Sequence, residues 1–333
     1  MKILFMFTGG TIGCTAHGDV IGIDGKKPYL LLERYREIYG MDFDYTTETP
    51  YLALSESNTG DTIRLLCESV RAQLSAGYDG IVVTHGTDTL QYSAAALAYT
   101  LADAEIPVLL VSSNQPIESP TANGLANLHG AIRFIREVGR SGVFVSYQNK
   151  GEALKIHRGA RLLASPAFSD GVYSIFDSFF GHFPAEGAFC ENPDYRALPD
   201  AGGTLSAAHF TATCDGICRL FAYPGNPYSA LPAGVRYLLH ESYHSGTINT
   251  AEQGAEEFFK AAKAKGVKVF LTGVAEGATY ESTRVFEELG IEPIFGLAPI
   301  AAFVKLWLLT AENPQATVTA EMLQASLAAD VVP

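Results

Sequence analysis

Short apolar runs alternate with longer segments of helical periodicity through the first half of the chain. Four apolar runs predict buried strands: "KILFMF" (2–7), "DGIVVTHG" (79–86), "IPVLLVSS" (106–113) and "GVFVSY" (142–147). Three segments between and after them predict helices: 59–77, 90–103 and 126–139. Thr59 suits the start of the first helix as an N-cap, and Gly77 suits its end. Strands separated by helices predict parallel βαβ units with both sheet faces covered.

The alternation weakens between about 183 and 211, where Pro, Gly and polar residues dominate. It then resumes, with strands expected at 216–223, 235–241 and 267–273, and helices at 251–266, 280–290, 300–309 and 320–329. A chain of 333 residues also exceeds one typical core. We therefore expect an α/β protein of two domains. These are a larger, doubly wound and mostly parallel N-terminal sheet (1–188), a linker (189–211) and a smaller C-terminal α/β domain (212–333).

Composition narrows the possible partners. The formal net charge of −13 disfavours binding to nucleic acids and to anionic membrane surfaces, because such binding depends mainly on Lys and Arg. The opening apolar run is too short for a signal peptide, and an apolar run of about 18 residues is absent from the sequence, so we expect a cytoplasmic protein. Five cysteines, an odd number in a long chain, argue against a disulfide framework.

Two threonine-rich turns directly follow predicted strands. "TGGTIG" (8–13) follows the first strand, and "THGTDT" (84–89) ends the second. Because ligands bind at the carboxyl ends of parallel strands, we expect the two turns to share one edge of the sheet. The first turn lacks the lysine of a P-loop and the spacing of GxGxxG. A plainer interpretation stays open for both turns. The first is then a glycine-rich turn whose threonines cap the next segment; in the second, Thr87 or Asp88 only caps a helix and His85 is a buried structural histidine.

Taken together, the two turns resemble those of the bacterial-type asparaginase/glutaminase family. Four further stretches match the family in the same order: "LSESNTGDT", "NGLANL" (123–128), "SYHSGT" and "VKLWLL". The resemblance spans nearly the whole chain. It implies an amidohydrolase that releases ammonia from L-asparagine without a metal or organic cofactor, in a homodimer or homotetramer whose active site lies at a subunit interface.

The resemblance also implies roles for individual residues. Thr11 matches the family's nucleophile, Thr87 a threonine that assists proton transfer, and Asp88 an aspartate that binds the substrate's α-amino group. Such chemistry is reasonable, since a hydroxyl nucleophile needs a base or relay and an ammonium pairs best with a carboxylate. The residues expected to contact the substrate are Ser55, Glu56, Gly10 and Gly86.

Three positions depart from the family pattern. Val20 stands where the family's mobile loop often carries a tyrosine, and Ala164 stands near the position of its catalytic lysine. Lys150 and Lys155 are near in sequence but out of register. Glu56 replaces a residue that is neutral in many members. These departures leave open a divergent enzyme with a rebuilt relay, a hydrolase of another amide such as D-asparagine or glutamine, and an amino-acid sensor that does not turn over.

Two other interpretations compete with this one. The tRNA-dependent amidotransferase subunit of similar fold carries an extra N-terminal domain, whereas the first strand here starts at Lys2, so we do not favour it. "HESYH" (240–244) satisfies H-E-x-x-H, which binds zinc when it lies on a helix. The preceding residues predict a strand, and Ser245 and Gly246 follow the motif at once, so we expect no metal site there.

Overall fold

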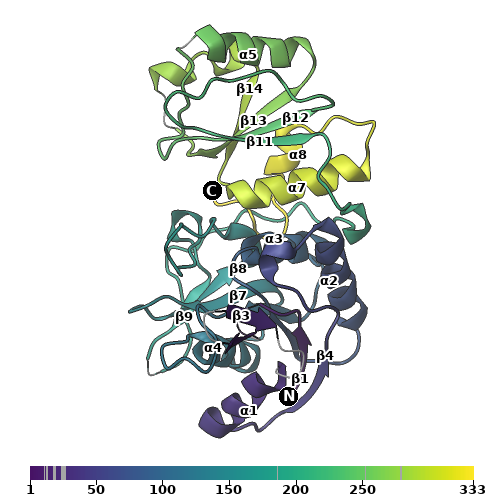
Figure 1. The fold of residues 1–333 in the computed structure, drawn as a ribbon, viewed down its shortest axis with the longest axis vertical. Coiled ribbons are helices and arrows are strands. Elements are labelled where there is room, and N and C mark those ends of the chain that lie inside the picture. The colour runs from purple at the N-terminus through teal and green to yellow at the C-terminus, as the bar shows by residue number, and fades with distance from the viewer. Residues whose placement is uncertain are drawn as a thin grey trace.

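The computed structural model describes residues 1–10, 12, 14–17, 20–23, 28–185, 187–251, 253–277 and 280–333. Two sheets organise these residues (Figure 1). The strands of the large sheet are β1 (Lys2–Phe7), β4 (Asp44–Glu48), β5 (Gly80–Thr84), β6 (Pro107–Val111), β7 (Gly142–Gln148), β8 (Leu154–Arg158), β9 (Gly181–Phe183) and β10 (Cys190–Glu191). The strands of the small sheet are β11 (Ile217–Phe221), β12 (Tyr237–Glu241), β13 (Lys268–Val274) and β14 (Ile291–Phe295).

The large sheet has the spatial order β10-β9-β8-β7-β6-β5-β1-β4. Its strands β4, β1, β5, β6 and β7 are parallel, which confirms the expected βαβ organisation. Strands β8, β9 and β10 extend it in antiparallel fashion, which the sequence pattern did not predict. The short segment 149–153 between β7 and β8 allows only a tight reversal, because a parallel connection needs a longer crossover.

The small sheet has the order β11-β12-β13-β14 and is parallel throughout. A separate antiparallel pair joins β2 (Cys14–His17) and β3 (Val20–Ile23). The described α-helices are α1 (Pro28–Tyr39), α2 (Gly60–Gln73), α3 (Leu90–Thr100), α4 (Gly124–Glu137), α5 (Gln253–Ala264), α6 (Phe286–Leu289), α7 (Pro299–Glu312) and α8 (Ala320–Gln324).

Alternating side chains of β1 show why the large sheet is covered on both faces. Ile3, Phe5 and Phe7 pack in a cluster with residues of α1 and α4. Leu4 and Met6 point the other way, into a cluster with residues of α2 and α3. Side chains of a strand alternate between faces, so an unbroken apolar run can be buried only when helices cover both. The expected doubly wound arrangement is confirmed.

Local sequence explains the start of α2 and the end of α6. Helix α2 starts after Thr59 in a capping box, in which the Thr59 amide donates to Thr62 Oγ1 at 2.7 Å. The helix expected over 280–290 is instead a 3₁₀ turn, Glu281–Thr283, followed by the short α6. Gly290, with φ 72°, ends α6 in the left-handed conformation that favours glycine.

Helices α3 and α7 lie between the two sheets, and the chain ends beside them (Figure 1). One continuous apolar cluster includes residues of α3, α7 and both sheets, so the two parts share a core. The expected domain limits stay a prediction. The short β10 lies inside the segment 189–211 expected to be the linker.

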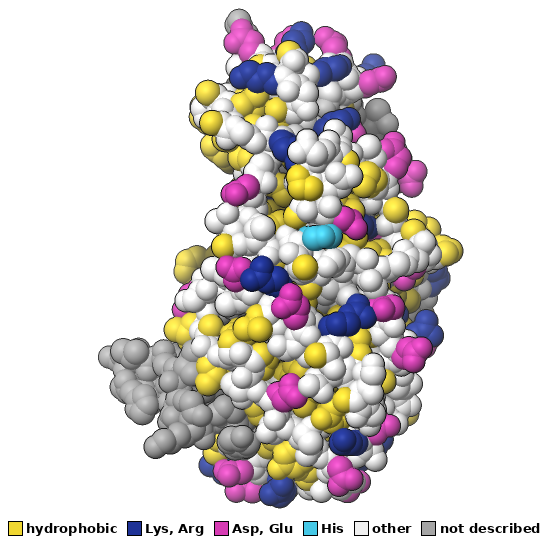
Figure 2. All heavy atoms as spheres, turned by 90° about the vertical axis from the view of Figure 1, so that its right-hand side faces the viewer, with side chains coloured by type: hydrophobic (Ala, Val, Ile, Leu, Met, Phe, Trp, Pro, Cys, Tyr) yellow, Lys and Arg dark blue, Asp and Glu magenta, His cyan; other side chains and the backbone are white. Residues whose placement is uncertain are grey.

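Acidic and basic side chains are interspersed on the face shown in Figure 2, where no broad basic area is visible. This distribution agrees with the acidic composition. Within the described ranges, no helix is both long enough and apolar enough to cross a bilayer.

Candidate active site

The turn after β1 is fixed by backbone contacts on both sides. The Gly10 amide donates to Ala53 O at 3.2 Å, and the Ala53 amide donates to Thr8 O at 3.0 Å. The Thr8 hydroxyl is buried and donates to Thr84 O at 2.6 Å. Thr8 therefore ties the end of β1 to the end of β5. Thr11, the expected nucleophile, lies outside the described residues, as does the side chain at Val20.

The turn after β5 begins with a buried histidine. The His85 amide donates to Val111 O at 2.9 Å, and His85 Nδ1 lies 2.8 Å from Gly86 O. Burial lowers the pKa of His85, which keeps its ring neutral. His85 Nε2 lies 3.4 Å from Asn58 Nδ2. These contacts give His85 a structural role in holding the turn.

Two glycines allow both turns to meet. A Cβ on Gly10 would overlap the backbone nitrogen of Gly86. A Cβ on Gly86 would lie 3.2 Å from Gly10 Cα and 2.6 Å from Ser55 Cβ. Only residues without side chains permit this approach, so Gly10 and Gly86 bring three distant segments to one point at the carboxyl edge of the sheet.

Ser55 links the third segment to the second turn. It begins the 3₁₀ turn Ser55–Ser57, its residue is only 4% exposed, and its hydroxyl donates to Asp88 Oδ2 at 3.0 Å. Its carbonyl accepts from Thr89 Oγ1 at 2.9 Å, and Thr89 Oγ1 in turn accepts from Asn58 Nδ2 at 3.0 Å. This network orients an exposed carboxylate beside the half-buried Thr87.

The structure thus places Ser55, Gly10, Gly86, Thr87 and Asp88 in one neighbourhood. Glu56 lies on the same 3₁₀ turn with an exposed side chain. Sequence reasoning did not assign Asn58 or Thr89 a role. Both lie within the quoted motifs, but their hydrogen bond crosses 31 positions of the chain and has no local signal.

The expected lysine position carries no charge here. Ala164 is exposed and follows the 3₁₀ turn Gly159–Arg161. Lys155 pairs with Glu152 at 2.9 Å and Asp177 at 3.6 Å, while Lys150 is exposed. In the described part of the chain, no hydrogen bond connects the Thr87 side chain to a lysine.

The segment "NGLANL" serves as scaffold beside the site. Asn127 is fully buried; its Nδ2 donates to Ser112 O at 2.8 Å, and its Oδ1 accepts from the Gln148 amide at 2.7 Å. Asn123 and Asn114 exchange amide–side-chain hydrogen bonds at 2.9 and 3.0 Å. Helix α4 therefore fastens the carboxyl ends of β6 and β7.

The H-E-x-x-H motif has the expected non-helical context. His240 and Glu241 end β12, and His240 is fully buried, with Nε2 3.1 Å from Tyr228 OH. Glu241 forms an ion pair with Arg219. Among the described residues, no three His, Cys, Asp or Glu side chains group as a metal site.

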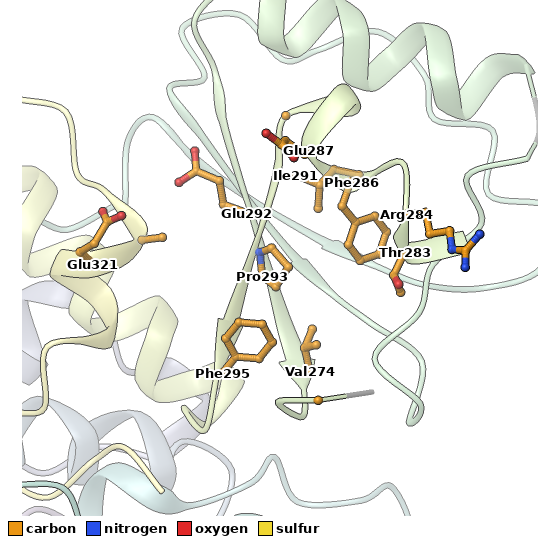
Figure 3. A pocket seen from close by; sticks show the side chains of 13 residues that line it. Val274, Thr283, Arg284, Phe286, Glu287, Ile291, Glu292, Pro293, Phe295 and Glu321 are labelled. Carbon is orange, nitrogen blue, oxygen red and sulfur yellow. The ribbon is translucent and has the colours of Figure 1, made fainter. Parts of the chain in front are cut away.

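A pocket of about 730 Å³ lies in the C-terminal part, lined by the end of β13, by α6 and β14, and by the start of α8 (Figure 3). Val274, Phe286 and Phe295 supply apolar walls, and Glu292 and Glu321 add acidic groups. None of the residues predicted for the active site lines it.

Comparison with known proteins shows the family of this chain. Residues 2–168 match the family model described as Asparaginase, N-terminal. The chain belongs to the asparaginase family. The two threonine-bearing turns of this asparaginase-family chain, residues 8–13 and 84–89, both lie within the matched region.

Individual relatives of this asparaginase-family chain differ in function. A glutamyl-tRNA(Gln) amidotransferase component from Sulfurisphaera tokodaii is 26% identical over 285 residues, 80% of this chain and 61% of that protein. L-asparaginase of Thermococcus kodakarensis is 44% identical over 73 residues, 22% of each chain. The chain therefore spans less than two thirds of the first relative.

The crystal structure of L-asparaginase I from Vibrio cholerae has the same fold. Its TM-score is 0.79 at 20% identity, with 100% of this chain and 99% of that chain covered. This likeness confirms the fold of the large sheet and the smaller parallel sheet.

Proposed function

We propose that this protein hydrolyses the side-chain amide of L-asparagine, giving L-aspartate and ammonia. The observation that carries the proposal is the close packing of Gly10, Gly86 and Ser55. The Ser55 hydroxyl donates a hydrogen bond to Asp88 at 3.0 Å. A carboxylate held beside two threonine-bearing turns suits a small substrate with an ammonium group and an amide. Family membership supports the same reaction class.

The proposed roles follow from this geometry and from the resemblance. The Asp88 carboxylate pairs with the substrate's α-ammonium, and Ser55 keeps that carboxylate oriented. The Thr11 hydroxyl attacks the amide carbonyl, ammonia leaves, and water then releases aspartate from the acyl-enzyme. Thr87 assists the proton transfers. Backbone amides of the turns stabilise the tetrahedral oxyanion.

A second candidate is an amino-acid sensor on the same scaffold. The observation that favours it is Ala164 at the expected lysine position, together with the lack of a described lysine hydrogen-bonded to Thr87. A threonine without a base is a weak nucleophile, so binding could persist while turnover is lost.

Substrate range and assembly belong to the same proposal. D-asparagine and L-glutamine are the alternative substrates. L-glutamine is included because one relative is named as a glutamyl-tRNA(Gln) amidotransferase component. The proposed assembly is a homodimer or homotetramer, and the proposed location is the cytoplasm. No metal or organic cofactor is required by the proposed steps.

Ammonia release and aspartate binding test the two functions together. We would assay the full chain on L-asparagine, D-asparagine and L-glutamine, and measure L-aspartate affinity by calorimetry. Release of ammonia from L-asparagine supports the enzyme, and tight aspartate binding without ammonia supports the sensor. The absence of both contradicts both functions.

Two variants test whether aspartate binds at Asp88. Asp88→Asn removes the charge that faces the ammonium, and should weaken aspartate binding by about 10- to 100-fold, the equivalent of a charged hydrogen bond. Asp103→Asn is the matched control, because Asp103 is exposed and pairs with Arg71 on the surface. Equal affinity in the two variants would contradict the role of Asp88.

A further inference from the structure

A second, smaller cavity lies at the opposite edge of the large sheet from the threonine turns. Its volume is about 290 Å³, and it opens where β7 begins, at Ser141 and Gly142. The end of α3 and the turn after it complete the wall, together with Tyr195, Ala197, Leu198, Asp200, Ala328 and Ala329. None of the residues predicted for the active site lines it.

Arg158, the last residue of β8, reaches this cavity. The residue is only 8% exposed, and its Nε donates to Tyr195 OH at 3.2 Å. The rings of Phe144 and Phe180 lie 4.5 and 5.1 Å from the guanidinium carbon. Ring stacking uses the faces of a guanidinium, so the N–H groups in its plane remain for an acceptor.

Arg158 forms no ion pair with a described carboxylate, although buried charges are normally paired. Gly142, with φ 113°, lets the guanidinium reach the cavity wall, since a Cβ there would lie 2.8 Å from Arg158 Nη1. Arg140 also lines the cavity, is exposed, and has no ion pair within the described ranges.

Two further charges lie nearby. Asp200 is the one carboxylate among the described residues that line the cavity, and its Oδ1 already accepts from Ser326 Oγ at 2.9 Å and the Ala329 amide at 2.8 Å. The fully buried Arg161 lies behind Tyr195, 4.6 Å from its ring, and adds positive charge. The wall near Arg158 and Arg140 is therefore cationic.

We propose that this cavity binds a small oxyanion, a carboxylate or a phosphate group, between Arg158 and Arg140. The planar fork of a guanidinium matches the oxygen spacing of either group. The volume is near the lower limit of small-molecule sites, which restricts the ligand to a few heavy atoms beyond the anionic group. The site is separate from the amide chemistry and does not depend on it.

The occupied site would connect the large sheet to the C-terminal residues. Ala328 and Ala329 form part of the wall, both in the left-handed conformation with φ 57° and 56°. The next residue, Asp330, pairs with Lys305 of α7. A bound anion should therefore stabilise the junction between the two sheets.

Calorimetry on the full chain with inorganic phosphate and with succinate tests the proposal. We expect one site per chain for at least one probe. Binding of phosphate alone assigns a phosphate ligand. Binding of succinate alone assigns a carboxylate ligand when Arg140→Glu weakens it and Asp88→Asn does not, and binding of both probes under that condition assigns the shared oxyanion chemistry. Failure of both probes to bind would overturn the proposal.

Charge variants locate the site. Arg140→Glu alters an exposed side chain and should weaken binding at least about 10-fold by reversing one of the two charges. Arg34→Ala, which breaks an exposed pair with Glu37, is the matched control and should leave the affinity unchanged. Wild-type affinity in Arg140→Glu would place the anion elsewhere and contradict the proposal.

Hydrogen exchange gives a second measurement that needs no change at the buried Arg158. Phosphate or succinate at saturation should slow exchange of the backbone amides in 325–332, since these residues form and adjoin the cavity wall. Unchanged exchange there, with binding observed, would contradict this location. Loss of ammonia-releasing activity bears on the proposed function and leaves this test unaffected.

Discussion

At the scale of single residues, the candidate site depends on two glycines, which have no side chain beyond Cα. Gly10 and Gly86 let two turns touch, and Ser55 fills the remaining space. The hydroxyl of Ser55 donates a hydrogen bond to Asp88. The position of the carboxylate thus follows from backbone packing, whereas its chemistry follows from the residue type.

Gly86→Ala tests this dependence. The new Cβ would lie 2.6 Å from Ser55 Cβ, so Ser55 must shift, and we expect its hydrogen bond to Asp88 to weaken. Displacement of a substrate-binding group by about 1 Å commonly costs about 100-fold in rate, and we expect a loss of that size in ammonia release. Gly254→Ala is the control; its nearest atom is Pro227 O at 3.9 Å, and activity should be unchanged. Equal activities would contradict the packing argument.

The burial of His157 should make the free energy of unfolding depend on pH. It is 2% exposed on β8, its Nδ1 lies 2.9 Å from Ser174 Oγ, and burial lowers its pKa to about 3. Between about pH 6.5 and about pH 3, the unfolded chain binds a proton that the folded chain does not. The free energy of unfolding is thus fully retained above about pH 6.5 and falls on acidification, by up to about 1.4 kcal/mol per pH unit from this group.

Urea denaturation at about pH 7 and about pH 5 measures this effect. His157→Gln removes the titrating group, so its loss of stability between the two pH values should be about 2 kcal/mol smaller than in the wild type. His85 and His240, whose pKa values burial also lowers, account for a remaining slope. An unchanged loss in His157→Gln would mean that His157 protonates freely when folded.

At the scale of elements, strand ends and helix starts decide where functional groups lie. Parallel strands β1 and β5 are neighbours, so the turns that follow them share an edge. Helix α4 then fastens the neighbouring ends of β6 and β7 through Asn127. The antiparallel strands β8 to β10 lie beyond β7 and carry the segment in which the expected lysine is replaced.

Asn127→Ala should destabilise the large sheet. The side chain is fully buried, and its removal leaves Ser112 O and the Gln148 amide without partners. Two unsatisfied backbone groups should lower the free energy of unfolding by about 2–4 kcal/mol, measured by urea denaturation. Asn313→Ala, on the surface, should cost less than about 1 kcal/mol. Similar costs would contradict the structural role of Asn127.

At the scale of the whole molecule, a buried ion pair joins the parts. Lys305 of α7 contacts Asp330 Oδ2 at 2.9 Å, and Tyr99 of α3 donates to the same oxygen at 2.9 Å. Lys305 also donates to Leu323 O at 2.9 Å and Ala325 O at 2.6 Å. One network therefore holds α3, α7 and the C-terminal residues together.

Asp330→Ala should leave the Lys305 charge buried and lower the free energy of unfolding by about 3–5 kcal/mol. The double variant Lys305→Met with Asp330→Leu should recover part of this loss, because it removes both charges. Asp103→Ala, which breaks an exposed pair with Arg71, should cost no more than about 1 kcal/mol. Urea denaturation compares the three variants, and a double variant less stable than Asp330→Ala would contradict the argument.

Sequence periodicity predicted the elements with strong local signals. The buried parallel strands β1, β5, β6 and β7, the helices α2, α3 and α4, and Thr59 as the N-cap of α2 agree with the pattern. Helix α1, the strands β4 and β14 and the antiparallel strands were not predicted. These elements are short or only partly apolar, so packing rather than local preference decides them.

The residue types at the candidate site could also be recognised, since hydroxyls, a carboxylate and glycines follow strands at fixed offsets. The hydrogen bonds among them could not, because Ser55 and Asp88 are 33 positions apart. The cationic cavity around Arg158 had no sequence signal, as its wall comes from separate segments of the chain.

The sequence by itself determined the doubly wound arrangement and the edge of the sheet that carries the threonine turns, because alternating apolar strands and helices permit few topologies. Only the tertiary structure decided which groups touch: Ser55 with Asp88, Lys305 with Asp330, and Arg158 with an open cavity instead of a described carboxylate. Contacts between distant segments depend on how whole elements pack, and local preferences alone do not specify that packing.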